Sequence, residues 1–361
     1  MNFKPFDTGM DLWTYLQSTQ KKIVMYGMGN GADKILSVCE KYNIEVCDFF
    51  ASDGFVRGHS FHGKTVLSYS DAKSKYGADN MIVLLSFASS LDDVIENIKR
   101  ISAECELYAP DVPVCADELF TLDYARKHSS ELTEAYSLFA DDRSKQIFEN
   151  VVAYKLSGNI DFLFSAESDK DEVYKILLKA EDIQSYADLG AYNGDTVREL
   201  MKYSPDLTRV VAFEPDRRSF RKLSEFCDTI EKNPQIQKIN AAAWSGDATL
   251  TFGDEGNRNS GLFAKGKAID VAATSLDNVL DSVGVDYIKY DVEGCEKEAI
   301  EGSKRTILNY SPKLLVSMYH RSEDIFALPL QIHSLNSDYK LYLRRYRYIP
   351  AWDLNLICVK K

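Results

Sequence analysis

The chain lacks several features that would place it outside ordinary soluble enzymes. Its seven cysteines are scattered and odd in number, and none forms a C-x-x-C pair, which argues against a zinc site or a disulfide framework. The longest apolar run, residues 81–87, is far too short to cross a bilayer, and the N-terminus has no apolar signal-peptide core. We therefore expect a soluble, cytoplasmic protein whose thiols are reduced.

Low-complexity runs and internal repeats are also lacking, as is any excess of basic residues. The net charge of −12 and the pI near 5.0 argue against non-specific binding to nucleic acid or anionic membrane. With 45% hydrophobic and 27% charged residues, the chain has the composition of a globular protein. Its 361 residues favour two domains over one.

Residues 185–202 carry the pattern from which the other predictions follow. An apolar run ends in Asp188-Leu-Gly190, a second glycine follows at Gly194, and helix-compatible residues continue to Lys202. This order predicts a strand, a tight turn and a helix, the first unit of a doubly wound α/β domain. A second predicted strand ends in Glu214, about 20 residues past the turn, where ribose-binding acids usually lie.

The predicted mouth of this unit is acidic. Asp188, Asp195 and Glu214 suit a cationic ligand better than a pyrophosphate, and S-adenosylmethionine carries both a sulfonium and an ammonium group. The alternative interpretation is a glycine turn of the kind found in any α/β protein. The Glu214 strand favours the nucleoside ligand.

A second glycine turn lies near the N-terminus. Gly27-Met-Gly-Asn-Gly-Ala32 follows a predicted strand and fits the form G-x-G-x-x-G/A, but Asp53 comes late for a ribose acid. This unit either binds a nucleotide or serves packing and contacts between copies of the chain. We predict an N-terminal Rossmann-like domain over residues 1–115, a helical bridge or cap over 116–180, and a third domain over 181–361.

The C-terminal part continues the α/β alternation to its end. A loop over residues 253–267 is predicted between two short strands. The last two strands, 340–345 and 355–359, are too close for a crossover helix, so they must form an antiparallel hairpin. We predict an α/β fold whose seven-stranded, mostly parallel sheet ends in this hairpin.

These blocks resemble the FkbM family of S-adenosylmethionine-dependent methyltransferases over roughly residues 180–361. The resemblance is carried by Asp188-Leu-Gly-Ala-Tyr-Asn-Gly-Asp-Thr196, Ala212-Phe-Glu-Pro-Asp216, Asn240-Ala-Ala-Ala-Trp244, Thr274-Ser-Leu-Asp277 and Ile288-Lys-Tyr-Asp-Val-Glu-Gly294. It implies O-methylation of a sugar, a glycan precursor or a natural-product hydroxyl, as in polysaccharide biosynthesis. The candidate cofactor contacts are Asp188, Gly190, Ala191, Tyr192, Asn193, Gly194, Asp195, Thr196, Glu214, Pro215, Ala242 and Asp291.

Three residues are candidates for removing the acceptor's proton. Asp291 and Glu293 follow a predicted strand next to the central one, and His320 follows the strand after it. Histidine titrates near neutral pH and is a good base for a hydroxyl. The alternative is that the two acids lie in a solvated turn and the histidine in a surface loop.

A divalent metal bound by Asp291, Glu293 and His320 is possible but not favoured, because no second carboxylate–amide pair follows the last parallel strand. A different class of function also stays open at this point, namely a catalytically silent nucleotide-binding sensor or scaffold. The intact Gly190, Gly194, Glu214 and Asp291 favour the methyltransferase.

Overall fold

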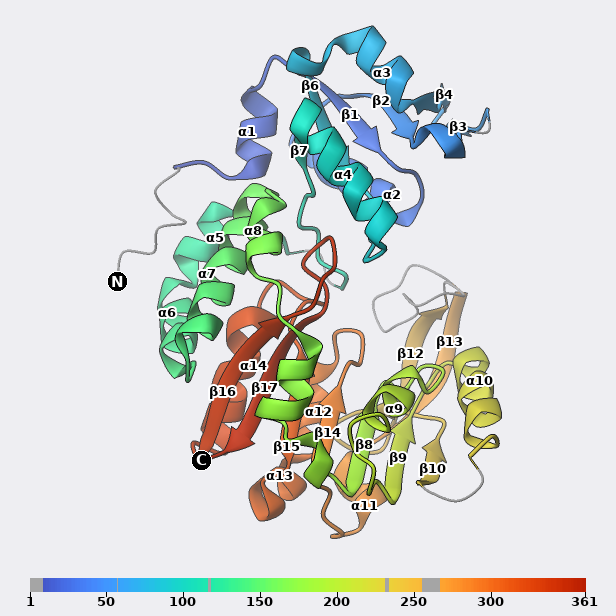
Figure 1. The fold of residues 1–361 in the computed structure, drawn as a ribbon, viewed down its shortest axis with the longest axis vertical. Helices are drawn as coiled ribbons and strands as arrows, with labels where there is room; N and C mark the ends of the chain where they lie inside the picture. The colour runs from blue at the N-terminus through green and yellow to red at the C-terminus, as the bar shows by residue number, and fades with distance from the viewer. Residues whose placement is uncertain (1–8, 57, 116–117, 231–233, 255–266) are drawn as a thin grey trace.

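The computed structural model describes residues 9–56, 58–115, 118–230, 234–254 and 267–361. Two β-sheets organise the chain, one at the top of Figure 1 and one at the bottom, and a group of helices lies beside the second sheet. The predicted loop over residues 253–267 falls mostly on residues 255–266, which lie outside the described ranges.

The N-terminal unit is a parallel sheet of order β5-β2-β1-β6-β7. Its central strands are continuous apolar runs because helices cover both faces of the sheet. The sheet strands are β1 (Lys22–Tyr26), β2 (Val46–Ala51), β5 (Leu67–Ser68), β6 (Met81–Leu85) and β7 (Glu106–Tyr108). The other elements are α1 (Leu12–Ser18), α2 (Asn30–Lys41), α3 (Tyr69–Tyr76), α4 (Asp92–Glu104), η2 (Asp53–Phe55), η3 (Ala78–Asn80) and the small hairpin β3 (Ser60–Phe61) and β4 (Lys64–Thr65).

The middle of the chain is helical, and its longest helix packs against the C-terminal sheet. Asp141 caps α7 by accepting a hydrogen bond from the Ser144 amide at 2.7 Å, and Gly158 ends the helix in the left-handed conformation. Buried residues of α7 share one core with Leu341 and Leu343 of β16. The helical elements are α5 (Leu122–Lys127), α6 (Ser129–Leu138), α7 (Asp142–Ser157), α8 (Asp161–Ser165), the π-helical η4 (Glu172–Leu177) and η5 (Ala180–Asp182).

The C-terminal sheet has seven strands in the order β10-β9-β8-β14-β15-β17-β16. β17 runs antiparallel to both β15 and β16, and the other pairs are parallel, so the predicted sheet with a final antiparallel hairpin is confirmed. Its strands are β8 (Ser185–Leu189), β9 (Arg209–Phe213), β10 (Gln235–Ile239), β14 (Tyr287–Tyr290), β15 (Lys313–Ser317), β16 (Tyr339–Arg345) and β17 (Leu354–Lys360).

Helices cover both faces of this sheet, and a small three-stranded sheet lies next to it (Figure 1). The helices are α9 (Asp195–Leu200), α10 (Arg217–Cys227), α11 (Leu276–Leu280), α12 (Glu296–Glu301), α13 (Lys304–Tyr310) and α14 (Asp324–Leu335). The small sheet consists of β11 (Ala242–Ala243), β12 (Ala248–Asp254) and β13 (Lys267–Thr274).

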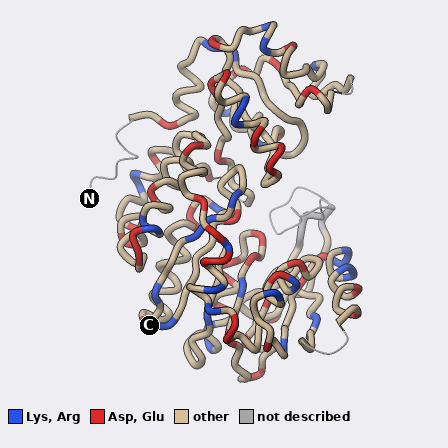
Figure 2. Tube along the Cα trace, in the orientation of Figure 1, with Lys and Arg blue, Asp and Glu red and all other residues tan. Residues whose placement is uncertain are grey.

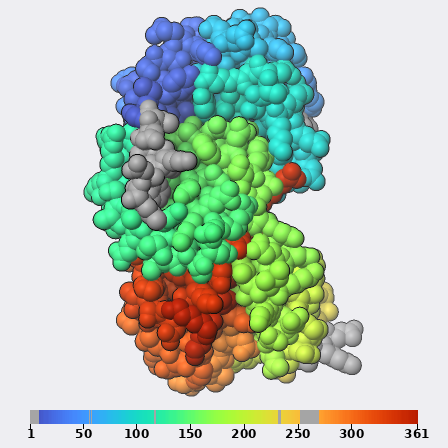
Figure 3. Space-filling model, turned by 60° about the vertical axis from the view of Figure 1, so that its left-hand side comes forward, coloured from blue at the N-terminus to red at the C-terminus, as the bar shows by residue number. Residues whose placement is uncertain are grey.

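The two units touch through the loop between β16 and β17. Backbone hydrogen bonds of 2.9 and 3.0 Å join Ser89, after β6, to Ile349 in this loop. In Figure 3 this red segment reaches the cyan N-terminal unit. A second contact comes from the segment after β7, where the Cys115 amide donates to the His320 carbonyl at 2.9 Å. The N-terminal unit is thus tied to the strand ends of the C-terminal sheet.

Acidic and basic residues are interspersed along the trace in Figure 2, so the net charge of −12 is not gathered in one segment. No helix within the described ranges has the length and apolar character that a membrane crossing requires.

Candidate active site

A cavity of about 590 Å³ opens at the carboxyl ends of β8, β9 and β14. Ligands of open α/β sheets bind at this edge, where the strand order reverses. One part of the cavity is bordered by Gly190, Tyr192 and Glu214. Another part is bordered by Tyr319, Tyr348 and Trp352 from the last strands of the sheet.

The glycine turn after β8 brings two strand ends into contact. Gly190 has a φ of +93°, and a Cβ atom placed on it would lie 2.0 Å from the backbone oxygen of Asp291 at the end of β14. Gly194 has a φ of +82°, and a Cβ there would meet the ring of Phe226. Both glycines are therefore required by the packing of the protein itself.

Glu214 stands at the end of β9 with its carboxylate held by two backbone amides. Its oxygens accept hydrogen bonds of 2.8 Å from Tyr192 and from Asp216. Each carboxylate oxygen can accept a second bond, so the group keeps capacity for a ribose diol. Burial raises the pKa of Glu214 to about 8, although the two amide hydrogen bonds lower it. These features fit the nucleoside of S-adenosylmethionine.

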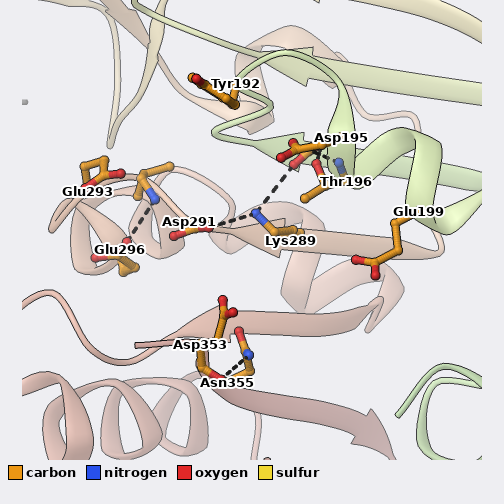
Figure 4. A network of polar contacts seen from close by, with 12 residues as sticks. Tyr192, Asp195, Thr196, Glu199, Lys289, Asp291, Glu293, Glu296, Asp353 and Asn355 are labelled. Atoms are coloured by element: carbon orange, nitrogen blue, oxygen red, sulfur yellow. Dashed lines mark hydrogen bonds and ion pairs between the residues drawn. The ribbon is translucent and has the colours of Figure 1, made fainter. Parts of the chain in front are cut away.

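Behind the turn, the buried Lys289 lies between two acids, and Figure 4 shows its contact with Asp291. Lys289, on β14, places its Nζ 3.2 Å from Asp291 and 4.0 Å from Asp188. Asp188 is fully buried and accepts a hydrogen bond from the Thr196 hydroxyl. Burial raises the pKa of Asp188, and the positive charge of Lys289 opposes that shift.

Carboxylates surround His320, which is fully buried. Its Nε2 lies 3.6 Å from both Asp291 and Glu293, and its Nδ1 lies 3.0 Å from Glu296. Glu296, in the first turn of α12, also accepts the Val292 amide at 2.9 Å. Asp291 and Glu293 line the cavity and are 29% and 36% exposed, whereas His320 lies behind them.

The contacts around His320 shift the pKa values of His320, Asp291 and Glu293 in different ways. Burial lowers the pKa of His320, but Glu296, Glu293 and Asp291 together raise it to about 10, so the imidazole is protonated at neutral pH. Burial raises the pKa of Asp291, but Lys289 and His320 bring it below its ordinary value. Burial and the neighbouring acids raise the pKa of Glu293 to about 7 despite His320.

The same cluster is the only group of metal-type ligands found within the described residues. One ligand atom each of Asp291, Glu296 and His320 lies within 4.8 Å of the others. Carboxylate oxygens and an imidazole nitrogen could hold a divalent ion, but a protonated imidazole has no lone pair for a metal.

The cavity brings together most of the residues predicted from the sequence. Those that line it are Gly190, Tyr192, Asp195, Thr196, Glu214, Pro215, Ala242, Asp291 and Glu293. Five predicted site residues do not line the cavity: Asp188, Ala191, Asn193, Gly194 and His320. Ala191 belongs to a hydrophobic core. Sequence reasoning missed Lys289, Glu296, Tyr319 and Trp352 as site residues. Lys289 lies within the Ile288–Gly294 motif. A charged residue in an otherwise apolar strand was the signal that could have identified it, because buried charges are rare unless they are paired.

The sheet topology and the cavity at its strand ends form a Rossmann-like arrangement, which binds its ligand at this edge of the sheet. Residues 188–350 match the family model described as the methyltransferase FkbM domain. This match over the C-terminal part of the chain indicates an S-adenosylmethionine-dependent methyltransferase rather than a silent scaffold.

A solved structure shares this fold. The chain is similar to the crystal structure of methyltransferase FkbM from Methylobacillus flagellatus KT, with a TM-score of 0.70 and 18% identity over 99% of this chain and 92% of that one. It is also similar to an rRNA methylase from Streptococcus thermophilus, with a TM-score of 0.34 and 13% identity over 52% of this chain and 93% of that one. A third similar structure is Aeropyrum pernix fibrillarin in complex with natively bound S-adenosyl-L-methionine. Its TM-score is 0.33, with 13% identity over 50% of this chain and 68% of that one. No curated protein matches the chain significantly.

Proposed function

We propose that this methyltransferase acts on a hydroxyl group of a sugar, a glycan precursor or a related natural product. The observation that carries the proposal is the carboxyl group of Glu293, which borders the cavity and has a pKa raised to about 7. A general base is most effective when its pKa lies near the working pH. A hydroxyl acceptor must lose a proton during methyl transfer, and Glu293 is placed to receive it.

The cofactor is proposed to lie along the glycine turn. Glu214 accepts the ribose hydroxyls, and Asp195 and Thr196 border the same part of the cavity. Lys289 and Asp291 offer opposite charges for the carboxylate and the ammonium of the methionine portion. Once bound, S-adenosylmethionine supplies a methyl group activated by the sulfonium, and the protein contributes alignment and proton transfer.

Proton transfer is proposed to run through Glu293 rather than directly to His320. The sequence favours His320 as the base, but its ring is buried behind the two acids. We therefore assign His320 a positioning role, in which the imidazolium holds the carboxylates of Asp291 and Glu293 in place. When S-adenosylmethionine is bound, it would supply the methyl group to the acceptor oxygen, and Glu293 would receive the hydroxyl proton.

Aromatic side chains in the cavity support a sugar as acceptor. The rings of Tyr319 and Trp352 have centres 6.3 Å apart and planes inclined by 29°, and the ring of Tyr348 lies 5.5 Å from that of Trp352. The apolar faces of sugar rings pack well against such rings, while their hydroxyls need polar partners such as Asp291 and Glu293. A cavity with both surfaces suits a polyhydroxylated ring.

The test combines cofactor binding with an acceptor panel. We expect the protein to transfer a methyl group from S-adenosylmethionine to methyl glycosides, but not to matched amino or thiol compounds, as detected by mass spectrometry. Transfer to the amine or the thiol alone would contradict the proposed acceptor class. Titration calorimetry with S-adenosylmethionine shows independently whether the protein used is active in cofactor binding.

A further inference from the structure

A second cavity, of about 260 Å³, adjoins the first at the N-terminal unit. It lies beside the Gly27-Met-Gly-Asn-Gly-Ala32 turn, at the carboxyl ends of β1 and β6. Val114 and Trp352 line both cavities. Whatever fills the first cavity near Trp352 therefore borders the second.

The glycine turn at this cavity lacks the partners that a nucleotide requires. A Cβ on Gly31 would lie 2.1 Å from the Ser86 backbone oxygen, so this glycine allows α2 to pack against the end of β6. Asp48 accepts hydrogen bonds from Lys75 and Tyr76, and Asp53 accepts the Tyr69 amide at 3.0 Å. Neither acid lines the second cavity, and the contact at Gly31 gives the motif a packing role.

The lining of the second cavity is mainly apolar. Two of its polar side chains have hydrogen-bond partners: Lys34 donates to the Val114 carbonyl at 2.9 Å, and Ser86 donates to the Tyr26 carbonyl at 3.0 Å. No carboxylate occurs among its described lining residues. The apolar contacts come from Met28, Ile35, Leu85, Phe87, Val112 and Pro350. Such a cavity binds an apolar group, because burial of apolar surface is the favourable term it can supply.

Trp352 connects this apolar cavity to the proposed chemistry. Its ring stacks on Tyr319, whose hydroxyl donates to Asp291 at 3.0 Å. The loop that carries Trp352 is fixed to the N-terminal unit by the Ser89–Ile349 hydrogen bonds. The two cavities therefore keep a defined relation to each other.

We propose that the acceptor is amphipathic, with its hydroxyl-bearing end at Glu293 and an apolar portion in the second cavity against Trp352. In this arrangement the N-terminal unit selects the acceptor by its apolar portion. The proposal rests on the proposed O-methyl transfer for the position of the hydroxyl. The binding of the apolar portion is a separate property that needs no turnover.

Octyl β-D-glucoside, below its critical micelle concentration, and methyl β-D-glucoside are the probes. They share a sugar and differ in the apolar chain. In the presence of S-adenosylhomocysteine, we expect the octyl glucoside to bind at least about tenfold more tightly, because its chain would bury apolar surface in the second cavity. Equal binding of the two glucosides would overturn the proposal.

Ala88→Phe tests whether the octyl chain binds in the second cavity, because Ala88 lines that cavity and lies outside the first. The larger side chain should remove the preference for the octyl glucoside and leave the affinity for S-adenosylmethionine within about twofold. Ala103→Phe, at an exposed position of α4, is the matched control and should keep the preference. A preference that survives in Ala88→Phe would place the octyl chain elsewhere and contradict the proposal. If the octyl preference depends on Ala88 but no glucoside is methylated, the proposed function fails while the apolar site stands.

Discussion

At the scale of single residues, Glu214 and Glu293 have carboxyl groups with raised pKa values but different expected roles. Glu214→Ala leaves two ribose hydroxyls without their hydrogen-bond acceptor, so the affinity for S-adenosylmethionine should fall about ten- to a hundredfold. Calorimetric titration measures this loss. Asp206→Ala, at an exposed position outside the cavity, is the control, and unchanged affinity in a folded Glu214→Ala would remove Glu214 from the cofactor site.

Glu293 should govern the pH dependence of turnover. Its pKa is raised to about 7 and the ionised form is the base, so kcat should increase as the pH rises through about 7. Glu293→Gln should lower kcat by about 10²–10⁴ and remove this inflection, while S-adenosylmethionine affinity stays within a few-fold. His320→Gln should also lower kcat. If Glu293→Gln kept the pH–rate profile of the wild type, a group other than Glu293 would be the base.

At the scale of elements, the decisive contact is between the turn after β8 and the end of β14. Gly190→Ala adds a Cβ at 2.0 Å from the Asp291 oxygen in a left-handed conformation. The strand ends must separate, so we expect a loss of about 2–4 kcal/mol in unfolding free energy and at least a tenfold loss of cofactor affinity. Gly246→Ala, which meets nothing within 4 Å, should change neither quantity in thermal melts and titrations.

At the scale of the whole molecule, several buried groups bind protons more tightly in the folded state. The pKa of His320 is raised to about 10, that of Glu214 to about 8 and that of Glu293 to about 7. Because all three pKa values are raised, the folded state holds more protons, and stability must fall as the pH rises. We expect the unfolding free energy to decrease between about pH 5 and pH 10 in denaturant titrations.

The contributions separate by pH range in that experiment. The His320 contribution is complete below about pH 6.5 and is lost as the pH rises through about 10, whereas the Glu293 contribution is lost between about pH 4.5 and 7. His320→Gln should flatten the alkaline part of the curve. A stability that increased toward pH 10 would show that the imidazole is not held in the charged form.

Local patterns in the sequence predicted the sheet and the glycine side of the cavity. The turn at Gly190 and the strand end at Glu214 each follow directly after a short apolar run. The hydrophobic pattern of the sequence is therefore sufficient to predict both positions. Glu296 could not be assigned in this way, because in sequence it is one of several acids at the start of a helix. Its contact with His320 depends on how α12 packs. Trp352 reaches the cavity through a loop whose position is set by a bond to the N-terminal unit.

Cys115 has a consequence for how the protein unfolds. Its amide donates to the His320 carbonyl, and its thiol donates to the Glu293 carbonyl at 3.1 Å. The segment that leaves the N-terminal sheet therefore cannot detach without releasing both backbone positions that hold the proposed base and its partner. The two sheets should therefore unfold in a single calorimetric transition. When the N-terminal sheet opens, the amides around Glu293 should exchange hydrogen at the same rate as the amides of that sheet.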